Sequence, residues 1–224
     1  VGYMDSKIFP VGFLFDLDGV LIDSEKEYSR IWRQVNCEFP CGVESLESMI
    51  KGCTLDKILE DHYPDLLVRE KVVNRLYELE GKMRYDYTPG AFSLLTELQG
   101  RSLQTALVTS SNDVKMAHLD EELPDFRNFF DCIITADLIS KSKPDPEGYL
   151  LASSKLGIPA KRCIVFEDSL QGVKAGFCSG AYVVGVAGTL SADVLEPYSD
   201  VVVDSLQKIN VDDLLRIVNS RNDK

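Results

Sequence analysis

Six short apolar runs, spread along nearly the whole chain, constrain its fold more than any other feature. They lie at 11–15, 105–108, 132–135, 163–166, 182–186 and 201–203. They do not alternate with polar residues and most are rich in β-branched side chains, which is typical of strands buried on both faces. Segments with helical signals lie between them, at 89–98, 145–156 and 169–177. This order predicts an α/β fold with a doubly wound, Rossmann-like parallel sheet.

One region interrupts the alternation. Between about 24 and 87 there is no convincing strand, and the segments 25–35, 45–49, 54–61 and 67–84 all have helical spacing. The sequence DYTPG at 86–90 is suited to a return hinge. We therefore expect residues 1–22 and 89–224 to form the Rossmann-like core, and residues 23–88 to form a small helical cap inserted after the first strand.

Polar side chains follow four of the apolar runs. In open α/β sheets, ligands bind beyond the carboxyl ends of the strands. Each polar group alone has a simpler explanation, as a turn, a helix cap or a solvated lysine. Together they predict a site at one sheet edge for a cation and an anion, formed by Asp16, Asp18, Thr109, Ser110, Lys143, Glu167 and Asp168.

The residue types in this group are suited to phosphoryl transfer. Crowded carboxylates raise one another's pKa, and Mg²⁺ with oxygen ligands would remove that cost. We expect the metal ligands to come from Asp16, Asp18, Glu167 and Asp168. One carboxylate can attack a phosphoryl group, and a second can protonate the leaving oxygen and then activate water. A hydroxyl and a lysine can hold the remaining phosphoryl oxygens.

Four stretches carry a family resemblance: DLDGVLIDSE, LVTSSN, KSKPDPEGYL and VFEDSLQGVKAG. They occur in the order of the four motifs of the haloacid dehalogenase superfamily, which the chain resembles over nearly its whole length. The resemblance implies a Rossmann-like core with a helical cap. The Asp-x-Asp form of the first motif implies phosphotransfer rather than dehalogenation.

The resemblance also implies roles for individual residues. Asp16 would be the nucleophile and Asp18 the general acid and base. Thr109 and Lys143 would contact the phosphoryl group, with Ser110 nearby. Glu167 and Asp168 match the acidic pair of the family, in which Asp168 would be the direct ligand of Mg²⁺, together with Asp16 and the backbone carbonyl of Asp18.

The run ED-S-x-x-G-x-x-A is similar to the branch that contains β-phosphoglucomutase and sugar-phosphate phosphatases. The mutase has a cap histidine twelve residues after the nucleophile, where this chain has Tyr28, and a cap arginine near the position of Leu55. The loss of both favours hydrolysis over isomerisation, because a mutase must retain a bisphosphate. From the cap we expect Tyr28, Lys51 and Gly52 to contact substrate. Trp32 and Thr54 are further candidates, although helix packing is the simpler explanation for Trp32.

We therefore expect a phosphatase that acts on a small phosphorylated metabolite, a sugar or polyol phosphate. A phosphomutase and a non-catalytic phosphate-binding regulatory protein are the alternatives. A histidine-based hydrolase has little support, because neither of the two histidines, His62 and His118, lies in a Ser/His/Asp-like setting. A Cys3His metal set of Cys37, Cys41, Cys53 and His62 is a further alternative, although its spacing matches no compact zinc module.

The composition argues against some classes of binding partner and indicates the cellular compartment. The net charge is −12 with no dense Lys/Arg run, which argues against nucleic acid and anionic membranes. No apolar run approaches the roughly 20 residues of a membrane helix, and no secretory leader pattern is visible. The six cysteines are scattered without a CxxC pair, as in proteins with reduced thiols. We expect a cytoplasmic monomer or weak dimer.

Overall fold

A parallel sheet organises the structure, a computed structural model that describes residues 10–222. Its strands run in the order β3-β2-β1-β4-β5-β6, and every neighbouring pair is parallel. Their bounds are β1 Gly12–Phe15, β2 Gln104–Val108, β3 Cys132–Ile134, β4 Cys163–Glu167, β5 Tyr182–Val186 and β6 Val201–Val203. The predicted fold class and all six predicted strands are confirmed, with ends shifted by a residue at most.

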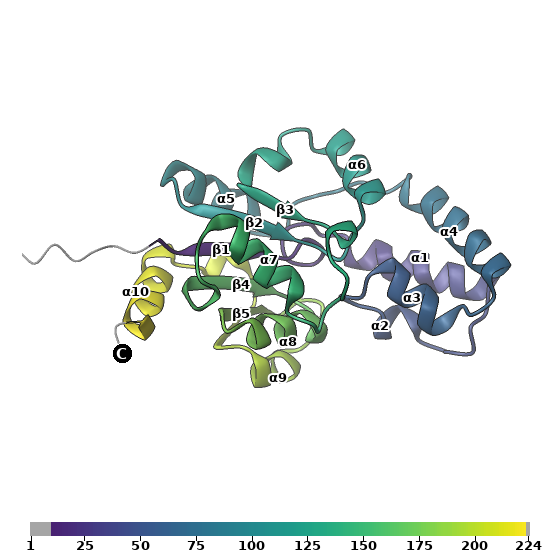
Figure 1. The fold of residues 1–224 in the computed structure, drawn as a ribbon. Helices are drawn as coiled ribbons and strands as arrows, with labels where there is room; N and C mark the ends of the chain where they lie inside the picture. Colours follow the sequence, from purple (N-terminus) through teal and green to yellow (C-terminus); the bar gives the residue numbers. More distant parts are fainter. Residues whose placement is uncertain (1–9, 223–224) are drawn as a thin grey trace, which may run out of the picture.

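Helices cover both faces of this sheet (Figure 1). Phe13 and Phe15 pack in one buried cluster with residues of α5 and α10, whereas Leu14 packs in the other cluster with residues of α7 and α8. Both faces of β1 are therefore dry, which is why its sequence is apolar without alternation. The helices are α5 Ala91–Gly100, α6 Asp113–Glu122, α7 Glu147–Leu156, α8 Leu170–Ser179, α9 Ala192–Leu195 and α10 Val211–Asn222, with 3-10 turns at η1 Phe126–Phe129, η2 Ala136–Leu138, η3 Ala160–Arg162, η4 Glu196–Tyr198 and η5 Leu206–Lys208.

Four further helices lie to one side of the sheet (Figure 1): α1 Glu25–Glu38, α2 Leu46–Met49, α3 Leu55–His62 and α4 Leu66–Glu80. They fall within the predicted cap, residues 23–88, which we call the cap segment; the exact division of the chain into domains stays a prediction. The last helix ends at Glu80 rather than at 84 as predicted, because Gly81 follows and glycine is a poor helix former.

The chain enters and leaves the cap segment at one place. Ile22 forms an isolated antiparallel bridge with Tyr87, and the backbone N–H of Thr88 donates to the carbonyl of Leu21 at 2.9 Å. The backbone N–H of Asp23 donates to the carbonyl of Asp86 at 2.9 Å. The two connections therefore lie side by side, which holds the cap segment next to the carboxyl end of β1.

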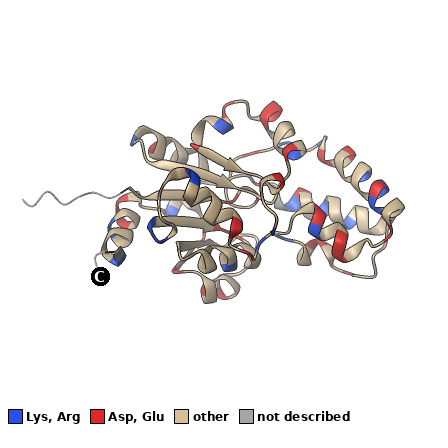
Figure 2. Ribbon diagram, viewed as in Figure 1, with Lys and Arg blue, Asp and Glu red and all other residues tan. Residues whose placement is uncertain are grey.

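Charged residues are concentrated on helices and loops, whereas the strands are almost free of them (Figure 2). Within the six described strands, Glu167 at the end of β4 is the sole charged residue. A fully buried charge requires partners, because desolvation otherwise costs several kcal/mol.

None of the helices that the structure describes is long and apolar enough to cross a membrane.

Candidate active site

The parallel register brings the residues after β1, β2 and β4 together. Strand β1 lies between β2 and β4, and Phe15 is in register with Leu107 on one side and Phe166 on the other. The backbone N–H of Asp16 donates to the carbonyl of Phe166 at 3.0 Å. The first residue after β1 therefore lies beside the last residue of β4, Glu167, as the sequence predicts.

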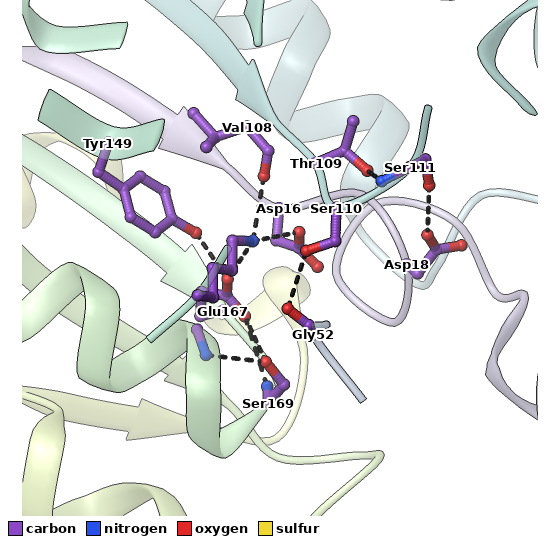
Figure 3. Close-up of polar contacts among 12 residues, drawn as sticks. Asp16, Asp18, Gly52, Val108, Thr109, Ser110, Ser111, Tyr149, Glu167 and Ser169 are labelled. Carbon is purple, nitrogen blue, oxygen red and sulfur yellow. Dashed lines mark hydrogen bonds and ion pairs between the residues drawn. The ribbon is translucent and has the colours of Figure 1, made fainter. Parts of the chain in front are cut away.

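Lys143 reaches this point from the loop between β3 and α7. Its Nζ donates to Oδ1 of Asp16 and to Oε1 of Glu167, both at 2.6 Å, and to the carbonyl of Val108 at 3.1 Å. Burial lowers the pKa of Lys143, but the two carboxylates outweigh it and raise the pKa above its ordinary value. A charged ammonium thus bridges two buried acids, Asp16 and Glu167, which are labelled in Figure 3.

Three acidic residues form a group that fits a cation. Oxygens of Asp16, Glu167 and Asp168 lie within 4.8 Å of one another, and all three side chains are buried. Burial and the negative charge of Glu167 raise the pKa of Asp16 to about 7. Gly19, at φ +78°, allows the loop after β1 to lie against this group, because a Cβ there would stand 1.9 Å from Oδ2 of Asp168. Carboxylate oxygens are the ligands that Mg²⁺ prefers, so the donor set fits the predicted metal.

Protein donors already hold Glu167. The Tyr149 hydroxyl donates to its Oε1 at 2.6 Å, in addition to Lys143, and the Ser169 hydroxyl donates to its Oε2 at 3.1 Å. Gly172 leaves space for the carboxylate, since a Cβ there would lie 1.9 Å from Oε2. Burial and the charge of Glu167 raise the pKa of Tyr149, which keeps its hydroxyl protonated as a donor. These bonds occupy lone pairs of Glu167 that a metal would otherwise use.

The Asp18 carboxylate lies apart from that acidic group (Figure 3). Its Oδ2 accepts from Nζ of Lys115 at 2.5 Å and from the Ser111 hydroxyl at 3.3 Å, and its Oδ1 accepts from the Ser24 hydroxyl. The structure therefore does not place the Asp18 side chain among the metal-binding oxygens. It faces the cavity between the core and the cap segment instead.

The two predicted phosphate-binding hydroxyls follow β2. Thr109 is buried, and its hydroxyl oxygen accepts from the backbone N–H of Ser111 at 3.0 Å. The Ser110 hydroxyl donates to the carbonyl of Gly52 at 2.9 Å and so joins the core to the cap segment. Gly52 has φ +76°, and a Cβ there would lie 2.7 Å from the Ser169 hydroxyl. Only glycine allows the cap segment to approach this closely.

A cavity of about 120 Å³ lies between the core and the cap segment. Tyr28, Lys51 and Gly52 line it, as predicted, and so does Trp32. Thr54 does not: it is the N-cap of α3, where its hydroxyl accepts from the backbone N–H of Lys57. The predicted substrate contacts from the cap segment, Thr54 excepted, therefore share one cavity with Asp16 and Asp18.

Sequence reasoning missed three buried residues that complete the site: Lys115, Tyr149 and Glu80. Lys115 lies in the first turn of α6, shortly after the predicted Ser110, and this proximity in sequence to a predicted site residue could have identified it. Nothing near Tyr149 or Glu80 in the sequence points to their partners. The alternative Cys3His set is not supported, because among residues 10–222 only Asp16, Glu167 and Asp168 converge as a metal-binding group.

Comparisons with known proteins identify relatives of this chain. The family described as "Haloacid dehalogenase-like hydrolase" matches residues 13–186. Hexitol phosphatase A of Escherichia coli (strain K12) is 30% identical over 208 residues, which cover 89% of this chain and 93% of that protein. Phosphorylated carbohydrates phosphatase of Thermotoga maritima is 29% identical over 174 residues, which cover 75% of this chain and 80% of that protein.

Solved structures agree on the fold. The crystal structure of β-phosphoglucomutase from Clostridium difficile superposes with a TM-score of 0.80 at 24% identity, covering 96% of this chain and 100% of that one. At this identity the likeness shows the fold alone. The family match and the relatives together show more: this chain belongs to the haloacid dehalogenase-like hydrolases.

Proposed function

We propose that this protein is a Mg²⁺-dependent phosphatase that hydrolyses a small sugar or polyol phosphate through a phosphoryl intermediate on Asp16. One buried group carries the proposal. In it Lys143 contacts both Asp16 and Glu167, and a carboxylate oxygen of Asp168 lies within 4.8 Å of oxygens of both acids. The names of the relatives support the substrate class, since they include hexitol, glycerol-1-phosphate and phosphorylated-carbohydrate phosphatases.

Asp16 would act as the nucleophile. One of its carboxylate oxygens forms a bond to phosphorus while the bond from phosphorus to the ester oxygen of the substrate breaks. Asp16, Asp168 and the backbone carbonyl of Asp18 would hold Mg²⁺, which supplies charge neutralisation between the carboxylate and the phosphoryl group. The Lys143 ammonium donates to Asp16 and stays close to the phosphoryl oxygens as their charge grows.

Asp18 would move the protons. Its carboxyl group donates a proton to the leaving alcohol oxygen, and the resulting carboxylate then takes a proton from the water that attacks the phosphorylated Asp16. The position of Asp18 is consistent with this role, because its carboxylate faces the cavity while Lys115, Ser111 and Ser24 hold it there. The hydroxyls of Thr109 and Ser110 would bind the transferred group.

Hydrolysis is favoured over phosphomutase activity by the cap segment. Tyr28 occupies the place of the mutase histidine, and its hydroxyl donates to Glu80 at 2.9 Å rather than facing a second phosphoryl group. Leu55, near the place of the mutase arginine, brings no charge to the cavity that it lines. Neither residue can retain a bisphosphate intermediate by charge.

A phosphate-release assay on a panel of sugar and polyol phosphates, with Mg²⁺ and with a chelator, tests the proposal. We expect release that requires Mg²⁺. β-Glucose 1-phosphate with a bisphosphate primer separates the alternatives: inorganic phosphate indicates a phosphatase, and glucose 6-phosphate a phosphomutase. Mg²⁺ binding without turnover of any ester would instead indicate the non-catalytic phosphate-binding protein.

A further inference from the structure

A further buried acid lines the cavity from the cap segment. Glu80 is the last residue of α4, is 8% exposed and lines the cavity. The Tyr28 hydroxyl donates to its Oε1 at 2.9 Å. A carboxylate offers about four lone-pair sites, so a single tyrosine donor leaves acceptor capacity for a ligand in the cavity that Glu80 lines. The proposed catalytic steps make no use of this residue.

Lys115 connects the two acids. Its Nζ contacts Oδ2 of Asp18 and lies 3.9 Å from the centre of the Tyr28 ring, the same ring whose hydroxyl holds Glu80. Burial raises the pKa of Glu80, and the Lys115 ammonium and the Tyr28 hydrogen bond oppose that rise. Asp18, Lys115, Tyr28 and Glu80 thus form one partly buried network across the boundary between the core and the cap segment.

The charge around the cavity favours one class of leaving group. Apart from Asp16 and Asp168, which belong to the metal-binding group, three carboxylates line it against two ammonium groups, and one of the two ammonium groups is held by Asp18. A second phosphoryl group would enter a region that is already negative, at a cost in desolvation and repulsion. Apolar side chains also line the cavity, among them Trp32, Ile58 and Leu76. A lining that combines apolar side chains with polar acceptors fits a polyol, which presents both C–H groups and hydroxyls.

We propose that Glu80 is the specificity-determining residue on the leaving-group side of the site: its carboxylate accepts hydrogen bonds from the hydroxyls of a neutral polyhydroxylated leaving group and repels a second phosphoryl group. The inference rests on the proposed phosphatase function and adds to it the residue that selects the substrate. In the proposed mechanism Asp18 contacts the ester oxygen, and Glu80 belongs to the same network and lines the same cavity.

Three substrates and two variants test this inference. The substrates are sorbitol 6-phosphate, fructose 1,6-bisphosphate and p-nitrophenyl phosphate, whose leaving group has neither further hydroxyls nor a second phosphate. Glu80→Gln keeps the shape and an acceptor for Tyr28. We expect it to lower kcat/KM for sorbitol 6-phosphate about tenfold, mainly through KM, because a charge-assisted hydrogen bond becomes a neutral one. For p-nitrophenyl phosphate, kcat/KM of the variant stays within about twofold of the wild-type value. The ratio of kcat/KM for fructose 1,6-bisphosphate to kcat/KM for sorbitol 6-phosphate rises.

Glu78→Gln is the matched control, on the same helix but exposed and paired with Arg75 and Lys82. It should change none of the three reactions. If Glu80→Gln lowers the turnover of all three substrates equally, or none, Glu80 does not determine specificity and the inference is overturned. If the wild-type protein hydrolyses p-nitrophenyl phosphate but not sorbitol 6-phosphate, the polyol class is wrong. Failure to hydrolyse any of the three would instead contradict the proposed function itself.

Discussion

The two sides of the cavity are built differently. On the core side, Asp16, Lys143 and Glu167 are fixed by strand ends and by several short bonds, among them the two 2.6 Å contacts of the Lys143 ammonium. On the cap side, Tyr28 and Glu80 lie on two different helices, 52 positions apart in sequence, and share one hydrogen bond of 2.9 Å. The core side therefore has the rigidity that bond formation needs, and the cap side has a surface that sequence change can reshape.

This difference has a thermodynamic counterpart. A charge that is fully buried among several partners makes each partner costly to remove, because the remaining charges stay desolvated. A hydroxyl with a single partner, such as that of Tyr28, contributes only one modest hydrogen bond. We therefore expect substitutions on the core side to change the turnover of every substrate, and those on the cap side to change the KM of particular substrates.

The largest effect should come from Asp16→Asn. An amide cannot form the covalent bond to phosphorus, so we expect kcat to fall by about 10³-fold or more for every phosphate ester, measured as phosphate release. Retained activity would mean that the nucleophile lies elsewhere.

The fold should tolerate this change. Burial raises the pKa of Asp16 to about 7, so folding favours its protonated form and the stability it contributes falls as the pH rises from about 4 to about 7. At pH 8, without metal, the neutral variant should be at least as stable as the wild type. A lower melting temperature at that pH would contradict the sign of this shift.

The next effect should come from Lys143→Ala. Removing the ammonium leaves Asp16 and Glu167 buried without their shared cation, which should lower the free energy of unfolding by about 3 kcal/mol and kcat by about 10²-fold. Urea unfolding and phosphate release measure the two quantities. Lys161→Ala, at an exposed lysine, is the control. If it lowers the free energy of unfolding and kcat as much as Lys143→Ala does, Lys143 has no special role in the site.

Lys115 lies on the boundary between the two sides and should show an intermediate effect. Lys115→Met removes the cation that positions Asp18, so we expect kcat for a polyol phosphate to fall about tenfold, and Lys115→Arg to recover part of it. The kcat for p-nitrophenyl phosphate should fall less, because its leaving group needs little protonation. Lys82→Met, at an exposed lysine, is the control. A uniform loss across substrates would show a structural role only.

The smallest effect should come from Tyr28→Phe. The ring stays beneath Lys115, and only the hydroxyl that donates to Glu80 is lost, which costs about 1 kcal/mol. We expect a rise in KM of a few-fold for a polyol phosphate and no change in kcat for p-nitrophenyl phosphate. A large drop in kcat for both would assign Tyr28 to the chemistry rather than to substrate selection.

The core side was predictable because strand periodicity fixes geometry. Once the apolar runs were identified as parallel strands, their ends had to meet at one edge, and this placed Asp16, Thr109 and Glu167 near one another without any knowledge of side-chain contacts. Lys143 was found because it follows the third of these apolar runs, although it lies in no helix or strand that would position it.

The cap side could not be predicted in the same way. Helical spacing gives the existence of α1 and α4 but not the angle at which they cross, so the contact between Tyr28 and Glu80 has no local signal. The end of α4 was also misjudged by four residues, which hid the position of Glu80 at the last turn. Tyr149 was overlooked for a related reason: an apolar helix face conceals a hydroxyl that holds a charge.

The hydrogen bond from Ser110 to the carbonyl of Gly52 has a consequence for affinity. A phosphoryl oxygen that accepts a hydrogen bond from the Ser110 hydroxyl must displace the Gly52 carbonyl. That carbonyl then needs another hydrogen-bond donor. The ligand therefore competes with the main chain of the loop between α2 and α3 for a single hydrogen. A sequence change in this loop that never touches the ligand can tighten or weaken its binding by altering how well the loop holds that proton.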